Sequence, residues 1–122
     1  MAAGDHLGTY AEGWTRGDAN TLLEAMSPDY VLDDPNTGRI AKSDFAAYFA
    51  KLTAELEAVR GGPPSGNFLE LSEIVTQEAD GVLTAWCWWT FPGTSIAGSG
   101  LIKASADGVL SERLTYYTRL SS

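Results

Sequence analysis

Hydrophobic residues recur at helical spacing in the first part of the chain. A first helix is predicted from four apolar residues that lie three or four positions apart, namely Leu7, Tyr10, Ala11 and Trp14. We expect Asp5 to be its N-cap and Gly17 to end it. A second helix is predicted over residues 19–26, with Asp18 as its N-cap. A third helix, with Ser43 as its N-cap, carries one apolar stripe formed by Phe45, Tyr48, Phe49, Leu52 and Leu56.

The second part of the chain has the pattern of β-strands. The loop RGGPPSGN at residues 60–67 separates the two parts. Four strands are predicted, at residues 68–79, 82–91, 95–104 and 109–120, and Asp80-Gly81 and Asp107-Gly108 are hairpin signals. Helices followed by antiparallel strands indicate an α+β fold. The length favours one domain, covering residues 1–122.

A short strand in the helical part, residues 30–34, ends in two aspartates and a proline. Side chains alternate between the faces of a strand, so Asp33 and Asp34 are predicted to point in opposite directions, one of them inward. A carboxylate in an apolar cavity has a raised pKa and can transfer protons near neutral pH. The alternative is that both aspartates cap the turn before Pro35, and the local pattern does not decide between the two.

Charge and composition narrow the set of partners. The net charge of −8 disfavours nucleic acid and anionic lipid. The sequence contains no membrane-length apolar run and no signal peptide at its start, and its single cysteine cannot form an internal disulfide, so we expect a cytoplasmic protein. With one histidine, one cysteine and no glycine-rich phosphate loop, we expect neither a metal nor a cofactor.

The spacing of three features resembles the ketosteroid isomerases of the NTF2-like (SnoaL-like) superfamily. The features are Tyr10 on the first helix, the turn Gly17-Asp18, and Asp34 before a proline on the first strand; the intervals from Tyr10 to Asp18 and from Asp18 to Asp34 are 8 and 16 residues. The segment GLIKASADGVLSERLTYY also resembles the last hairpin of that family, so the resemblance covers nearly the whole chain. It implies a cone-shaped fold in which three N-terminal helices pack on a strongly curved, mainly antiparallel sheet around a deep pocket.

The resemblance also implies roles for particular residues. Asp34 takes the place of the general base, and Tyr10 that of a hydrogen-bond donor to the enolate oxygen. Gly100 stands where the family has a protonated aspartate, and Phe49 where it has a second tyrosine. Losing one such donor lowers the rate by roughly a hundredfold to a thousandfold. We therefore expect a poor steroid isomerase that Gly100→Asp would improve.

Strand alternation and the same resemblance predict the rest of the pocket. Ala85, Cys87 and Trp89 would face inward, together with Trp14 from the first helix. Trp86 and Trp88 would face outward, where two exposed tryptophans need covering, so a homodimer through the outer sheet face is expected. The resemblance places Tyr117 in the pocket, and Arg113 shares its face. Arg113 either reaches Asp34, as in the epoxide hydrolases of this group, or extends to the surface.

Two classes of function remain open. One is a small acid–base enzyme without a cofactor, acting on an apolar, oxygen-bearing small molecule as an isomerase, polyketide cyclase or epoxide hydrolase. The other is a non-catalytic binding or dimerisation domain, and the fold does not decide between them. An open cavity lined by Tyr10 and Asp34 would favour the enzyme. A cavity filled by Trp14, Phe49 and Trp89 would favour a packing role.

Overall fold

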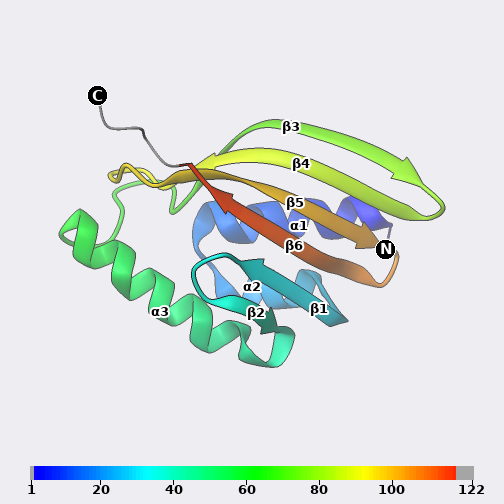
Figure 1. Cartoon of the computed structure of the whole chain (residues 1–122), viewed down its shortest axis with the longest axis horizontal. Coiled ribbons are helices and arrows are strands. Elements are labelled where there is room, and N and C mark those ends of the chain that lie inside the picture. The colour runs from blue at the N-terminus through cyan, green and yellow to red at the C-terminus, as the bar shows by residue number, and fades with distance from the viewer. Residues whose placement is uncertain (1, 118–122) are drawn as a thin grey trace.

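The computed structural model describes residues 2–117 and shows helices packed against one open, mostly antiparallel sheet (Figure 1). The helices are α1 (Ala3–Arg16), α2 (Ala19–Ala25) and α3 (Lys42–Arg60). The strands are β1 (Met26–Asp34), β2 (Gly38–Ala41), β3 (Glu70–Ala79), β4 (Val82–Thr90), β5 (Ala97–Ser105) and β6 (Gly108–Tyr116). The predicted α+β fold is confirmed.

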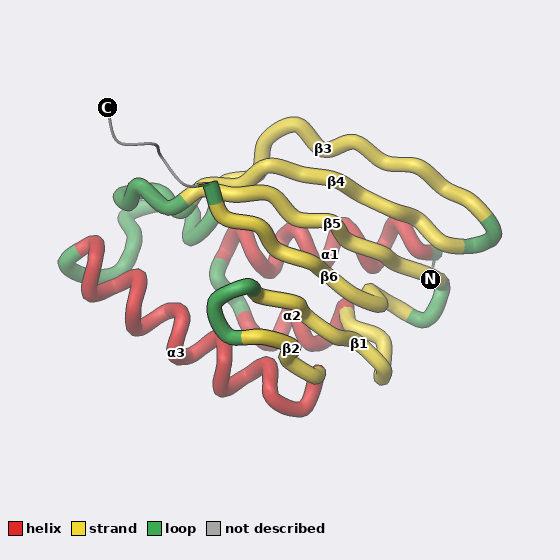
Figure 2. The backbone as a smooth tube through the Cα atoms, in the orientation of Figure 1, coloured by secondary structure: helices red, strands yellow, loops and turns green. Residues whose placement is uncertain are grey.

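The order of the strands in the sheet is β2-β1-β6-β5-β4-β3. Every neighbouring pair is antiparallel except β1 and β6, which run parallel. Helix α1 packs on β5 and β6, and α3 packs on β1 and β2. Figure 2 shows α1 behind β5 and β6, so that the front face of these strands has no helix of the described chain upon it. One face of the sheet is therefore internal and the other is open.

The helices begin and end close to the predicted residues, with small corrections at their starts. Gly17 adopts the left-handed conformation that ends α1, and the side chain of Asp18 accepts hydrogen bonds from the backbone of Asn20 and Thr21. Asp5 is not an N-cap; it lies inside the first turn of α1 and accepts from the Ala2 backbone N–H at 3.1 Å. Ser43 is not the N-cap of α3; the helix begins at Lys42, and its N-cap is residue 41.

The first strand is longer than predicted. Residues 27–29, which lie between the predicted second helix and the predicted strand, belong to β1, whose pairing with β6 shifts register between Met26 and Val31. The short strand β2 was not predicted from the sequence and pairs with the end of β1. The turn between them is held by Asp34, whose carboxylate accepts from the Asn36 N–H at 2.8 Å. The greater length of β1 and the presence of β2 both depend on pairing between strands, which the local sequence does not reveal.

The core is an aromatic layer between the helices and the internal face of the sheet. Phe45 contacts Trp14, Tyr30 and Phe49, with ring centroids 5.8 to 6.1 Å apart. All four of these side chains are buried. No helix among residues 2–117 combines the length and the apolar character needed to cross a bilayer. The aromatic layer does not fill the space beneath the sheet completely, and a cavity remains next to it.

Candidate functional site

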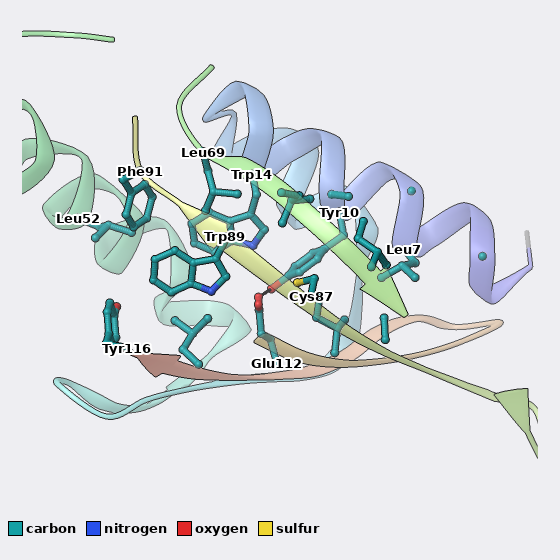
Figure 3. A pocket seen from close by; sticks show the side chains of 18 of the residues that line it. Leu7, Tyr10, Trp14, Leu52, Leu69, Cys87, Trp89, Phe91, Glu112 and Tyr116 are labelled. Carbon is teal, nitrogen blue, oxygen red and sulfur yellow. Dashed lines mark hydrogen bonds between the residues drawn. The ribbon is translucent and has the colours of Figure 1, made fainter. Parts of the chain in front are cut away.

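An apolar cavity of about 220 Å³ lies between α1 and the internal face of the sheet (Figure 3). Helix α1 contributes Leu7, Tyr10 and Trp14; β4 contributes Ala85, Cys87 and Trp89; β6 contributes Glu112, Leu114 and Tyr116. Among the described residues that line this cavity, Glu112 alone has an acidic side chain and none has a basic one. The chemistry that the cavity can perform therefore depends on this carboxyl group and its partners.

Tyr10 and Glu112 form a buried hydrogen-bonded pair. The Tyr10 hydroxyl donates to Oε1 of Glu112 at 2.5 Å. Because the single hydroxyl proton of Tyr10 is used in this way, the Tyr30 hydroxyl, also at 2.5 Å, must donate to the Tyr10 oxygen. Burial is the main cause that raises the pKa of both tyrosines well above the usual value, so both remain protonated. The result is a chain of hydrogen bonds in which Tyr30 donates to Tyr10 and Tyr10 donates to Glu112 at the cavity.

Glu112 is buried without a cationic partner among the described residues. It lies on β6 opposite Leu32 of β1 and Ile102 of β5, in the middle of the sheet. Burial raises the pKa of Glu112 to about 7; the Tyr10 hydroxyl and the Trp14 indole oppose this rise, but burial is the larger effect. At neutral pH, therefore, both the protonated and the ionised forms of this carboxyl group are populated.

Gly100 makes room for Glu112. A Cβ atom at position 100 would collide with Oε2 of Glu112 and would come within 3.7 Å of the Cys87 sulfur. The expectation that the pocket lacks an acid, because Gly100 stands where the family has an aspartate, is therefore wrong. The acid is present, but it comes from the neighbouring strand β6 and occupies the space that a side chain on β5 would need.

Asp34 faces inward, as predicted, but it does not contact Tyr10. The carboxylate of Asp34 accepts hydrogen bonds from Tyr48 at 2.6 Å and from Tyr116 at 3.2 Å. It lines a second, neighbouring depression beside α3, and Tyr48 and Tyr116 border both this depression and the cavity at Tyr10. Asp33 points to the other face and lies 3.8 Å from Arg39. The two faces were predicted correctly, whereas the proximity of Asp34 to Tyr10 was not.

The predicted orientation of side chains on β6 is reversed in the structure. Arg113 is exposed on the outer face, and Tyr117 follows the end of β6 with 52% of its surface exposed. Glu112, Leu114 and Tyr116 face the cavity instead. Among the described residues no ion pair joins Arg113 to Asp34, so the arrangement expected for an epoxide hydrolase is not formed. Leu114 and Tyr116 lie two and four positions after Glu112, so all three side chains share one face of the strand. The apolar character of Leu114 and Tyr116 was the sequence signal that this face is the internal one.

The predicted orientation of β4 is confirmed. Ala85, Cys87 and Trp89 line the cavity, and Trp86 lies on the opposite face. Burial is the main cause that raises the pKa of Cys87 to about 12, with a smaller effect from Glu112, so its thiol stays protonated. Trp14 also lines the cavity, as predicted. Phe49 does not, because it lies 5.5 Å from both Trp14 and Phe68, ring to ring, within the core.

No cluster of three or more potential metal ligands occurs within residues 2–117. Only one side chain that lines the cavity carries a carboxyl group, and the cavity wall is otherwise apolar or aromatic. The residues present therefore suit an organic ligand with few polar groups.

No protein-family model and no curated protein matches the sequence. Solved structures of low identity share the fold. An NTF2-like protein from Cytophaga hutchinsonii has a TM-score of 0.68 at 10% identity, covering 93% of each chain. An NTF2-like protein of unknown function from Shewanella baltica has a TM-score of 0.67 at 10% identity, covering 96% of this chain and 92% of its own. A "putative polyketide cyclase" from Xanthomonas campestris has a TM-score of 0.60 at 17% identity, covering 96% and 90%.

Proposed function

We propose that this chain, which has the NTF2-like fold, is a small acid–base enzyme acting on an apolar, oxygen-bearing small molecule. The observation that carries the proposal is Glu112, which is buried in an apolar cavity, hydrogen-bonded to Tyr10, and has a pKa raised to about 7. A general base works best when its pKa is close to the working pH. Glu112 thus takes the role that the sequence had suggested for Asp34.

The geometry supports an isomerisation or cyclisation that begins with proton removal. Oε1 of Glu112 accepts from Tyr10, which leaves Oε2 to receive a proton from a carbon next to a carbonyl group of the substrate. The same oxygen returns the proton at another position, so no co-reactant is consumed. The apolar wall keeps the carboxylate poorly solvated and therefore basic. Epoxide opening has less support, because Arg113 lies on the outer face.

Exchange of carbon-bound hydrogen for deuterium tests this proposal directly. The ketone 2-tetralone is incubated in deuterated buffer near pH 7 with the protein, and loss of its proton signals next to the carbonyl is followed by NMR. We expect the wild type to accelerate exchange and Glu112→Gln to lose this acceleration by about a hundredfold or more. Asp34→Asn is the matched control and should retain it. Exchange that is lost in Asp34→Asn and kept in Glu112→Gln would return the role of base to Asp34.

A non-catalytic binding domain remains the second candidate, favoured by the same apolar cavity. It becomes the better interpretation if the ketone binds in the cavity and neither variant alters the exchange rate.

We also propose that the chain forms a homodimer through the outer face of the sheet. Trp86 is 39% exposed there, and its ring centroid lies 5.9 Å from that of Trp88. No helix of the described chain covers this face (Figure 2). An aromatic pair on an open sheet face is stabilised when a second apolar surface excludes water from it.

A further inference from the structure

We propose that the ligand of the cavity is an uncharged molecule with an acceptor oxygen, distinct from its reacting position, that binds the indole N–H of Trp89. This inference rests on the proposed function, because it concerns the same cavity. It assigns Trp89 as a positioning residue: the indole would hold one end of the substrate while the other end lies at Glu112.

Trp89 presents a hydrogen-bond donor that the protein leaves unused. The residue is 3% exposed, and its Nε1 has no hydrogen-bond partner within residues 2–117. Buried N–H groups nearly always have a partner in native proteins, because leaving one without any costs free energy. Trp89 also lines the cavity, and in Figure 3 its nitrogen is on the side of the ring that faces the Glu112 carboxyl group. A bound ligand would supply the missing acceptor.

The indole ring of Trp89 is fixed in this orientation. Its ring packs edge-to-face on Tyr116, with centroids 5.4 Å apart, and lies 5.1 Å from the Phe91 ring. On the neighbouring strand a Cβ atom at Gly98 would come within 2.6 Å of Cζ2 of Trp89, so only glycine lets the indole lie this close to the sheet. The donor is therefore held in place before any ligand binds, which lowers the entropic cost of binding.

The other polar groups of the cavity wall are already engaged. Tyr10 donates to Glu112, Tyr48 and Tyr116 donate to Asp34, and the Cys87 thiol lies 3.8 Å from the Gly100 carbonyl, to which it donates. The N–H of Trp14 forms no hydrogen bond of standard geometry with the described residues, but it lies close enough to Glu112 to favour the ionised form. Trp89 is thus the donor best placed to bind a ligand.

Charge and chemistry define the class of ligand. None of the lining residues within 2–117 is basic, so the one charged group that an anionic ligand would meet among them is the Glu112 carboxyl, which repels it when ionised. An ammonium group has no lone pair to accept from the indole. A ketone, lactone or ester oxygen on a mostly apolar body meets both conditions.

The test uses two uncharged ligands that differ by one oxygen, 1-indanone and indane, at about pH 9. At that pH Glu112, with its pKa of about 7, is ionised and can no longer donate to the ketone. We expect wild-type protein to bind 1-indanone about threefold to tenfold more tightly than indane. We also expect the Trp89 indole N–H signal to move downfield with the ketone only. Trp89→Phe should bind both ligands about equally, and Trp86→Phe, on the outer face, should keep the preference.

The outcomes separate this inference from the proposed function. Glu112→Gln retains the Trp89 donor and should retain the ketone preference even if proton transfer proves wrong. A preference that survives Trp89→Phe, equal binding of the two ligands by the wild type, or no saturable binding of either ligand would each overturn the inference. If Trp89→Phe fails to fold, the wild-type spectra decide, since equal shifts of the Trp89 N–H with both ligands would also overturn it.

Discussion

Replacing Glu112 by glutamine should change how the stability of the protein depends on pH. Glutamine has the same shape, and its amide oxygen still accepts from Tyr10, but it does not ionise. In the wild type the folded protein holds a proton on Glu112 up to about pH 7, whereas a glutamate in the unfolded chain loses its proton near its ordinary pKa of 4.5. Between these values the folded state binds more protons than the unfolded state, so stability falls as pH rises.

The expected magnitude follows from the two pKa values. Each unit of difference corresponds to about 1.4 kcal/mol, so the interval from 4.5 to about 7 corresponds to roughly 3 kcal/mol. This contribution is fully present below about pH 4.5 and is lost above about pH 7. Relative to Glu112→Gln, the wild type should therefore lose roughly 3 kcal/mol of unfolding free energy between pH 4.5 and pH 8.

Urea unfolding of both proteins at several pH values measures this difference. Other titrating groups, including Asp18 with its lowered pKa, are common to both proteins and cancel in the comparison. The exposed residue Glu24 supplies the matched control, and Glu24→Gln should follow the wild-type dependence. If the urea concentration at the unfolding midpoint changes with pH by the same amount in the wild type and in Glu112→Gln, proteins with and without the Glu112 carboxyl respond alike to pH. The buried, near-neutral carboxyl group would then be refuted.

Three further predictions concern other parts of the structure. Gly100→Ala should destabilise the protein by about 1–3 kcal/mol in urea unfolding, because its Cβ would collide with the Glu112 carboxylate; no loss would show that this carboxylate lies elsewhere. Asp34→Asn should cost about 1–3 kcal/mol, because two tyrosine hydroxyls lose a charged acceptor, while Asp33→Asn stays near the wild type; equal effects would contradict the assigned faces. Sedimentation should show a dimer that Trp88→Glu converts to a monomer, and a monomeric wild type at micromolar concentration would exclude the interface.

Much of the fold could be predicted from the sequence because it depends on local interactions. Helix ends depend on neighbouring residues, and Gly17 with Asp18 was sufficient to place the end of α1 and the start of α2. The alternation of side chains along a strand depends only on the strand itself, which is why Asp33 and Asp34 were correctly predicted to lie on opposite faces of β1. The family resemblance added which face is internal, with Asp34 inward on β1 and Cys87 and Trp89 inward on β4.

The partner of Tyr10 was decided only by the tertiary structure. Glu112 is 102 positions from Tyr10 along the chain and reaches it because β6 pairs with β5 and β1. No local pattern indicates that the space above Gly100 belongs to a side chain of the next strand. The pKa of Glu112 depends in turn on burial, which exists only once the helices cover the sheet. The sequence by itself therefore determined the helices, most of the strands and the inward side chains of β4, whereas packing between distant segments determined β2 and which acid lies in the cavity.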